Sequence, residues 1–232
     1  MINIKTIASG STGNCYRISD GDAVLMIECG IRFKLIQKAF DYQLSNVSGC
    51  LVSHEHGDHC KALKDVIRAG VNCYATAGTR NGISVGDSRR LKIIKAGKQF
   101  CAGLFTILPF SVQHDAQEPV GFLLQSGSDK LLFATDSFYL RARFRGLTHI
   151  MIECNYSNEM LDENIKNGAM HKSLAERTKR SHFEIENVKR FLQANDLKKV
   201  REIHLIHISK TNGDPDFFKS EIEKMVGIPV II

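Results

Sequence analysis

Closely spaced cysteine pairs are missing from the sequence, although it contains seven cysteines. Their odd number and the lack of any CxxC spacing exclude a disulfide framework and a structural zinc ribbon. No run approaches the roughly 20 apolar residues that a membrane-spanning helix requires, and the first residues lack the charged end and apolar centre of a signal peptide. We therefore expect a cytoplasmic protein without a membrane partner, whose cysteines pack as small core residues.

Internal repeats, low-complexity tracts and Pro- or Gly-rich linkers are also missing. The composition, 43% hydrophobic and 24% charged, is ordinary for a globular protein. A single domain over residues 1–232 is the simplest organisation for a chain of this length. The formal net charge of +6 is compatible with a polyanionic partner but does not by itself indicate one.

Short apolar runs separated by turn residues alternate with helical patterns along the chain. A strand at 50–53 precedes a helix at 60–69, where Gly70 is a suitable stop. A helix at 214–226 begins after Asp214, a plausible cap. Residues 157–200 are expected to be mostly helical, including an apolar face made of Val188, Phe191 and Leu192. Further strands are expected at 2–8, 14–19, 23–28, 104–112, 120–126, 130–136, 148–154, 201–209 and 228–232. This order predicts a layered αβ architecture.

The segment SHEHGDH places four ligand-type side chains between a predicted strand and a predicted helix: His54, His56, Asp58 and His59. Imidazole nitrogens and carboxylate oxygens suit zinc, manganese or iron. Four such groups are more than one tetrahedral ion needs from a single loop, so the segment indicates two adjacent ions. Gly57 is expected to let the loop turn tightly. The alternative is a solvent-exposed polar run that happens to contain three histidines.

Three further ligand-type residues, His114, Asp136 and His207, lie at or just past the ends of predicted strands. One edge of the sheets could gather them beside the histidine segment. Each residue, taken alone, is equally well explained as a structural residue, and it is the set that indicates a metal site.

The motifs SGSTGNCY, ECGI, SHEHGDH, HDAQEPVGF, TDSFY and ECN together resemble the metallo-β-lactamase-fold hydrolases, and more narrowly their WalJ (YycJ)-like branch. The resemblance extends over nearly the whole chain. It implies an α/β fold of the four-layer αββα metallo-β-lactamase type, with the site at one edge of two packed sheets.

The resemblance also implies a dinuclear site that uses a metal-bridging hydroxide, with two divalent ions that are zinc or manganese, or else iron. One ion would be held by His54, His56 and His114, the second by Asp58, His59 and His207, and Asp136 would bridge both.

Catalytic roles are expected for Asp58 and for His182. His182 could protonate a leaving oxygen or contact a phosphate. It stands in RSHFEIEN, where related proteins carry a Gly-His-Ser/Asn-type motif, and an ordinary histidine near a helix start is the alternative. The expected substrate-binding residues are Ser11, Asn14, Asn155, Arg177 and Arg180. The turn SGSTGNC could offer N–H groups to an anion or be a plain hairpin turn, and the basic run 177–180 could grip a phosphate backbone or be a solvated helix face.

The remaining acidic residues and histidines are expected to have supporting or structural roles. Glu28 could accept a hydrogen bond from a metal-bound histidine, although the family more often has Asp there. Glu55 is expected to be solvated. His149, His171 and His204 belong to no motif and are expected to be structural or surface residues.

The leading functional hypothesis is a metal-dependent phosphodiesterase, most simply a DNA exonuclease. An aspartate rather than a cysteine at position 136 suits two hard or borderline ions. Residues 141–210 hold 14 Lys or Arg against 9 Asp or Glu, an excess of five positive charges that could meet a polyanion. The alternatives are a hydrolase of a small molecule, such as a cyclic nucleotide or a thioester, and a non-catalytic metal-stabilised binding protein.

Overall fold

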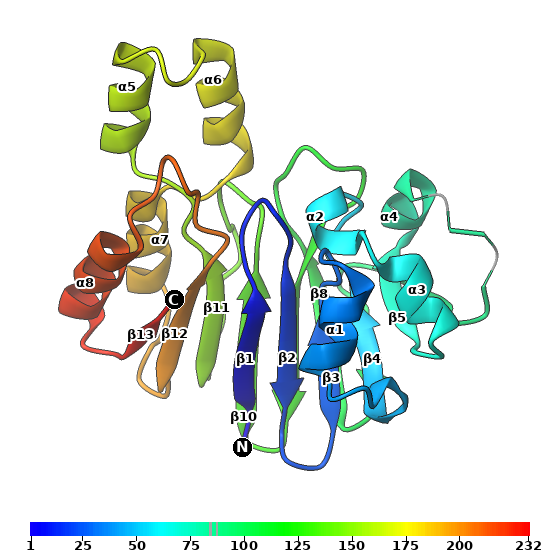
Figure 1. Ribbon diagram of the computed structural model, residues 1–232. Coiled ribbons are helices and arrows are strands. Elements are labelled where there is room, and N and C mark those ends of the chain that lie inside the picture. The colour runs from blue at the N-terminus through cyan, green and yellow to red at the C-terminus, as the bar shows by residue number, and fades with distance from the viewer. Residues whose placement is uncertain (84, 87) are drawn as a thin grey trace. The chain divides into compact units, whose positions relative to one another are not determined.

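The computed structural model describes residues 1–83, 85–86 and 88–232, which form two compact units. The first unit comprises residues 1–111 and 116–129, and the second comprises residues 112–115 and 130–232 (Figure 1). Within the described residues, every helix is too short or too polar to span a lipid bilayer.

The first unit is built on a six-stranded sheet in the order β1-β2-β3-β4-β5-β6. The pairs β1–β2 and β2–β3 are antiparallel, and the strands from β3 to β6 are parallel. Buried parallel strands are continuous apolar runs, as in the VLMI of β3. The strands are β1 (Asn3–Ala8), β2 (Cys15–Ser19), β3 (Val24–Ile27), β4 (Val47–Leu51), β5 (Cys73–Thr76) and β6 (Leu91–Ile94).

Helices cover one face of this sheet, as Figure 1 shows for α1, α2 and α3. Their bounds are α1 (Phe33–Ala39), α2 (Gly57–Cys60) and α3 (Leu63–Arg68), followed by α4 (Ala77–Gly82), and a short 3-10 turn, η1, spans Leu44–Asn46. An antiparallel ribbon, β7 (Phe100–Ala102), β8 (Phe105–Ser111) and β9 (Val120–Ser126), completes the unit.

The core of the first unit joins the parallel strands to these helices. Met26 of β3 and Cys50 of β4 are fully buried in one cluster with Ile36 of α1 and Val66 of α3. Six of the seven cysteines are buried, as expected, but Cys101 is exposed. The expectation is wrong for Cys101 because it lies on β7, an edge strand of the ribbon.

The second unit holds the parallel strands β10 (Asp129–Ala134, whose first residue belongs to the first unit), β11 (His149–Glu153), β12 (Glu202–Ile206) and β13 (Val230–Ile231). Its helices are α5 (Asn158–Lys166), α6 (Lys172–Ser181), α7 (Ile185–Gln193) and α8 (Pro215–Val226). The predicted apolar face of α7 is confirmed, since Val188, Phe191 and Leu192 are buried. The predicted cap is confirmed as well, because the Asp214 carboxylate accepts a hydrogen bond from the N–H of Phe217.

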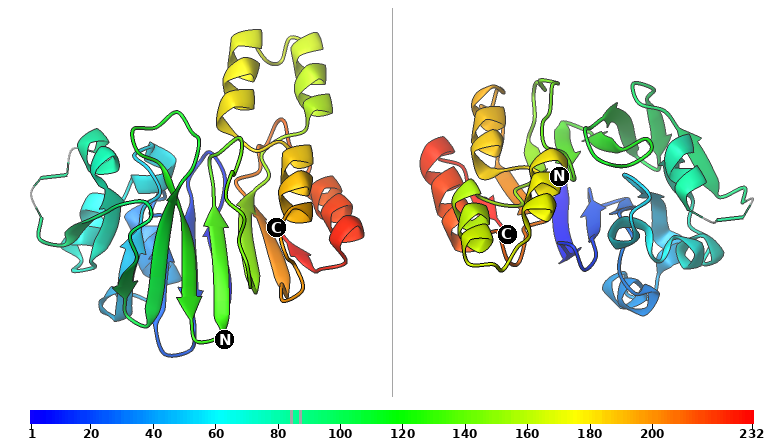
Figure 2. Two further views of the ribbon diagram at one scale, coloured as in Figure 1. Left: turned by 180° about the vertical axis from the view of Figure 1, so that it is seen from behind. Right: turned by 90° about the horizontal axis from the view of Figure 1, so that it is seen from above.

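Helices α5 and α6 stand as a pair beyond the carboxyl ends of β11 and β12, as both views in Figure 2 show. They pack through a small cluster that includes Leu161 and Ala175. Because β10, β11 and β12 run parallel, their carboxyl ends meet at one edge. Asp136, Glu153 and His207 therefore emerge side by side from three neighbouring strands.

Candidate metal centre

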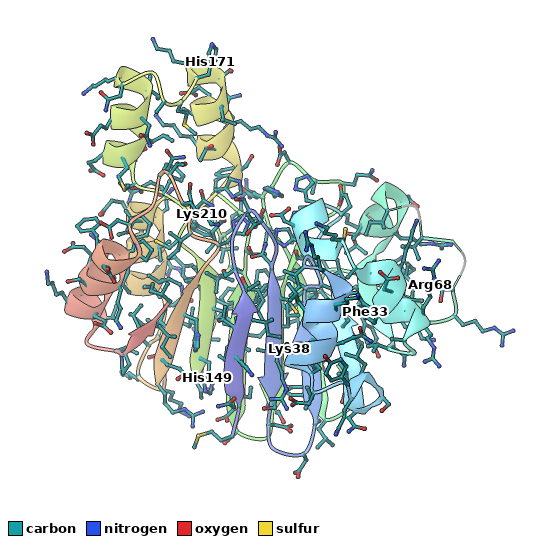
Figure 3. The ribbon with its side chains drawn as sticks, viewed as in Figure 1. Phe33, Lys38, Arg68, His149, His171 and Lys210 are labelled. Carbon is teal, nitrogen blue, oxygen red and sulfur yellow. The ribbon has the colours of Figure 1, made fainter. Side chains whose placement is uncertain are left out.

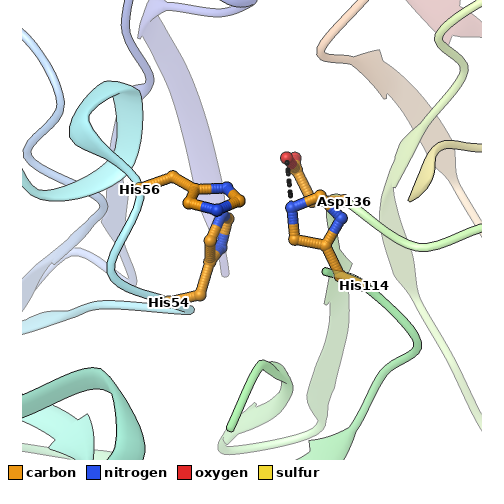
Figure 4. Close-up of side chains that lie close together, drawn as sticks. All are labelled: His54, His56, His114 and Asp136. Carbon is orange, nitrogen blue, oxygen red and sulfur yellow. Dashed lines mark ion pairs between the residues drawn. The ribbon is translucent and has the colours of Figure 1, made fainter. Parts of the chain in front are cut away.

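The first unit gathers three histidine rings between β4 and α2. His54 and His59 are buried, and the His54 ring lies 4.6 Å from that of His56 and 4.2 Å from that of His59, measured between centroids. His54 and His56 are shown in Figure 4. The segment is not a loop throughout, because Asp58 and His59 lie in the single turn of α2. A carboxylate in the first turn of a helix is favourable there.

Two side chains lie next to the Nδ1 atoms of the buried rings. Ser53 Oγ lies 2.9 Å from His54 Nδ1, and Glu28 Oε2 lies 3.5 Å from His59 Nδ1. The other oxygen of Glu28 accepts a hydrogen bond from the N–H of Ser53 at 3.1 Å. Glu28 thus lies beside His59 without a hydrogen bond between them, so acceptance of a hydrogen bond from a metal-bound histidine stays a prediction, and its carboxylate links the two histidine positions.

The SGSTGNC turn fastens the start of α2. The backbone N–H of Asn14 donates to the carbonyl of Asp58 at 2.8 Å. Its side-chain amide, which is fully buried, donates to the same carbonyl at 3.2 Å and lies 3.3 Å from His59 Nε2. These contacts make Asn14 a positioning residue, and its contact with a substrate stays a prediction. Ser11 lies exposed on the same turn.

Gly30, rather than Gly57, is the glycine that this site requires. A Cβ on Gly30 would lie 1.6 Å from the carbonyl oxygen of Asp58, whereas a Cβ on Gly57 would meet no atom within 4 Å. Gly57 does not have a positive φ either. The expectation that Gly57 allows a tight turn is therefore wrong, since the residue simply begins α2.

Gly30→Ala is accordingly expected to destabilise the protein by about 3 kcal/mol, the upper end for an overpacked site, because the clash is with backbone that cannot rotate away. Gly57→Ala, the matched control, should change the free energy of unfolding little. Urea denaturation of the two variants measures the difference. Equal stability of the two variants would contradict the close approach of Gly30 to Asp58.

Glu55 is not solvated as expected. Its Oε1 accepts a hydrogen bond from the N–H of Gln117 at 2.8 Å, and its Oε2 is buried without a hydrogen-bond partner. Gly82, the last residue of α4, packs closely on this side chain. Glu55 thus ties the histidine segment to residues 116–118, a role that alternation of polar and apolar residues does not reveal.

The second unit brings His114 and Asp136 together. His114 Nε2 lies 3.4 Å from Asp136 Oδ2, the ion pair drawn as a dashed line in Figure 4. His114 Nδ1 lies 3.0 Å from the carbonyl oxygen of Ser181, the last residue of α6. Burial lowers the pKa of His114 in spite of the neighbouring Asp136. The ring is therefore biased toward the neutral form, which is the form that binds metals.

Glu153, at the end of β11, contacts several of the candidate residues of the second unit. The sequence assigned it no role. One oxygen, Oε1, lies 2.6 Å from His182 Nδ1 and 3.1 Å from His207 Nδ1. The other, Oε2, accepts hydrogen bonds from the N–H groups of Ser137 and Phe183, at 3.0 and 3.2 Å. Its position at a strand end, like that of Asp136, was the available signal.

The Glu153 carboxylate is fully buried. Burial tends to raise its pKa, but the charges and hydrogen bonds of His182 and His207 outweigh burial and lower it. Burial likewise tends to lower the pKa of His182, and Glu153 outweighs it and raises that pKa. The two shifts describe one charge-assisted pair.

One ligand atom each from Asp136, Glu153, His182 and His207 lies within 4.8 Å of the others. His182 stacks on His207 at 5.5 Å between ring centroids. Predicted residue His182 is thus brought beside predicted ligands, although it departs from the family motif.

Asn155 and Arg177 also contact residues of the candidate site in the second unit or their neighbours. The Asn155 amide donates to the carbonyl of His207 at 2.8 Å. Arg177 of α6 pairs with Asp115, the neighbour of His114, at 2.8 Å. Arg180 is exposed on the same helix. The substrate contacts expected of these three residues stay predictions.

Three of the strand-end residues adopt backbone angles that side-chain-bearing residues rarely adopt. Glu28, Asp136 and His207 have φ values of 61°, 46° and 54°. Such conformations cost free energy and cluster at functional sites, where the surrounding structure enforces them. They turn each side chain out of the strand direction at the strand end.

The histidines without a motif lie elsewhere. Figure 3 shows His171 at the outer end of the α5–α6 pair and His149 at the opposite end of β11 from Glu153. His204 is buried in β12 and lies 3.1 Å from Glu202. All three are structural or surface residues, as expected.

The donor set fits divalent metal ions. In His114 and His207, Nδ1 lies at hydrogen-bond distance from a carbonyl or a carboxylate oxygen. Such a partner holds the proton on Nδ1 and presents Nε2 as the metal-binding atom, the usual arrangement of metal-bound histidines.

A family model described as a beta-lactamase superfamily domain matches residues 25–208. The chain belongs to the beta-lactamase superfamily. Within the superfamily it is 30% identical, over 172 residues, to the exodeoxyribonuclease YycJ of Bacillus anthracis, covering 69% of this chain and 65% of that protein. It is 26% identical, over 223 residues, to the exodeoxyribonuclease WalJ of Streptococcus pneumoniae, covering 89% and 81%.

Among solved structures, the metallo-beta-lactamase fold protein YhfI from Bacillus subtilis aligns with 100% of this chain and 95% of its own, at a TM-score of 0.75 and 18% identity. These likenesses confirm the predicted superfamily, its WalJ (YycJ)-like branch and the αββα fold class. They also support the predicted metal-dependent hydrolase.

Proposed function

We propose that the protein is a dinuclear metal-dependent phosphodiesterase that degrades DNA as an exonuclease. Its membership in the superfamily supports a metal-dependent hydrolase. The names of the two bacterial relatives, both exodeoxyribonucleases, support DNA as the substrate. Since the chain spans just under two thirds of the Bacillus anthracis protein, the activity requires a direct test.

The observation that carries the proposal is that the Nδ1 atoms of His114 and His207 lie at hydrogen-bond distance from the Ser181 carbonyl and the Glu153 carboxylate, with His59 Nδ1 beside the Glu28 carboxylate. We assign His54, His56 and His114 to one ion, Asp58, His59 and His207 to the other, and Asp136 to both. When bound, two such ions acidify water toward hydroxide near neutral pH and neutralise the charge that develops on a phosphodiester.

The chain's own residues would do the rest. Asp58, whose side chain is partly exposed, would accept a hydrogen bond from the attacking water. Glu153 holds the imidazole of His182 in place through a 2.6 Å contact. His182 would then donate a proton to the leaving oxygen of the sugar. The excess of five positive charges over residues 141–210 would attract the phosphate backbone.

The test is hydrolysis of end-labelled DNA by metal-free protein to which Mn²⁺ or Zn²⁺ is added, run beside His56→Ala. Release of mononucleotides is expected only with metal, and it should be lost in the variant because one ion loses a ligand. His171→Ala, on the outer end of α6, is the matched control and should cleave normally. A protein that binds two ions but cleaves neither DNA nor RNA would contradict the proposal.

A further inference from the structure

A pocket of about 270 Å³ lies in the second unit, between the connection from β10 to β11 and helix α7. Its floor is formed by the buried side chains Leu140, Phe183 and Phe191. Its rim carries Arg141, Arg143 and Arg190, together with the exposed ring of Tyr139. No acidic residue is among the eleven residues that line it.

The arginines on the loop side of the rim are available to an anion. In the part of the chain that the structure describes, neither Arg141 nor Arg143 forms a salt bridge or a side-chain hydrogen bond. Arg190 donates a hydrogen bond to the neutral amide oxygen of Asn187 at 3.1 Å and forms no salt bridge with any described residue. By contrast, Arg177 of the same unit is already paired with Asp115. A rim of cations without counter-charges is therefore concentrated at this pocket.

The loop that carries these arginines is fixed in place. The N–H of Phe144 donates to the side-chain oxygen of Asn195 at 2.7 Å, and the Asn195 amide donates to the carbonyl of Phe191 at the same distance. Phe144 and Phe191 pack at 6.3 Å between ring centroids. These contacts hold the loop against the end of α7, so the pocket is formed before any ligand arrives.

Both walls of the pocket are linked by hydrogen bonds to Glu153, the residue that contacts His182 and His207. Its Oε2 accepts from Ser137, whose hydroxyl donates to the carbonyl of Tyr139, and from the N–H of Phe183. Tyr139 follows the predicted ligand Asp136 by three residues, and Phe183 directly follows His182. Hydrogen bonds therefore link the pocket to the carboxylate that contacts His182 and His207.

We propose that this pocket binds one nucleotide of the DNA strand, the neighbour of the nucleotide that is being released. The base would stack on Tyr139 over the apolar floor, and the arginines would contact the flanking phosphates. Aromatic rings beside cationic side chains are the combination by which proteins hold single-stranded nucleic acid. The volume, just under the roughly 300–1,000 Å³ of small-molecule sites, suits one nucleotide. The inference rests on the proposed nuclease function.

The test measures binding of a short fluorescein-labelled oligothymidylate to metal-free full-length protein by fluorescence anisotropy at several salt concentrations. The variant Arg141→Gln/Arg143→Gln is compared with Lys198→Gln/Lys199→Gln, an equal loss of charge at exposed residues of the same unit outside the pocket. We expect the first variant to bind about tenfold more weakly and its salt slope to fall by about 1.4, for two lost phosphate contacts. The control should bind like the wild type.

Stacking is tested separately with Tyr139→Leu and Tyr139→Phe. The first is expected to weaken binding about tenfold and the second to preserve it, because only the first removes the ring. Metal content after dialysis should be the same in every variant, because none of these substitutions changes a proposed metal ligand.

The outcomes separate the two proposals. Wild-type protein that cleaves the oligonucleotide while the pocket variants bind it like their controls would overturn the pocket and leave the nuclease. Wild-type protein that neither binds nor cleaves it would overturn both.

Discussion

Asp136→Asn is expected to lower metal-dependent DNA hydrolysis by at least about 10³-fold, equivalent to about 4 kcal/mol of transition-state stabilisation. Asp136 is buried at 3% exposure. Its carboxylate contacts His114 at 3.4 Å and His207 at 3.6 Å. We assign it to both ions, so a neutral amide should weaken both. Asparagine tolerates a positive φ well, and the backbone at this position should keep its conformation.

Three measurements check this expectation. Metal content after dialysis should fall from two ions per chain, hydrolysis of end-labelled DNA should be lost, and the thermal unfolding midpoint of the metal-free variant should stay close to that of the metal-free wild type. Asp162→Asn on α5, where the side chain is 56% exposed, is the matched control and should retain both ions. A variant of Asp136 that keeps two ions and normal turnover would remove the residue from the site.

Glu153→Gln is expected to weaken metal binding by about 10- to 100-fold, the usual effect of removing the acceptor behind a metal-bound histidine. Glutamine keeps one oxygen for the N–H groups of Ser137 and Phe183. Its NH₂ group, however, cannot accept a hydrogen bond from Nδ1 of His182 or His207. The fold should therefore survive while the two rings lose their fixed orientation.

Competition with a chromophoric chelator measures that affinity, and a fall in turnover at saturating metal would report the loss of His182 orientation. Glu184→Gln is the control: this buried glutamate caps α7 through the N–H groups of Glu186 and Asn187 and touches no histidine. It should lose up to about 1 kcal/mol of stability as a weaker cap but keep its metal affinity.

Glu153→Ala tests how much the hydrogen bonds of the Glu153 side chain contribute to stability, apart from its charge. Removing the whole carboxylate leaves two buried N–H groups and two imidazoles without their acceptor, which is expected to cost about 3–5 kcal/mol. Urea denaturation of the metal-free protein measures this loss. If Glu153→Ala were as stable as Glu153→Gln, the hydrogen bonds to Ser137 and Phe183 would not hold the strand ends together.

Much of this architecture could be predicted because its signals are local. The strands β2, β3, β8 to β10 and β12 are apolar runs bounded by turn residues, and α7 shows a clear helical period. The histidine segment between β4 and α2 stands out because few other roles suit so many imidazoles. Asp136 and His207 could be added because residues that follow parallel strands share an edge, and His114 because it is a ligand-type residue just past the end of β8.

What could not be predicted depends on contacts between distant residues. Glu153 resembles any acid at the end of a strand until His182 and His207, from 29 and 54 residues away, are placed against it. Gly30 is required only because the Asp58 carbonyl lies where its side chain would be. Short elements such as α1, α4 and β5 to β7 were missed, since segments of three to seven residues carry too little periodicity.

The positive φ angles of Glu28, Asp136 and His207 have a consequence for how the protein can be improved. Glycine or asparagine would relax the backbone at each of these positions, so selection for heat resistance alone would favour their loss. A library screened only for survival on heating would then accumulate substitutions at these three strand ends. The selected variants would be more stable but would lose turnover. Screening for turnover in every round would keep the strained backbone, and the gains in stability would have to come from the helices and edge strands instead.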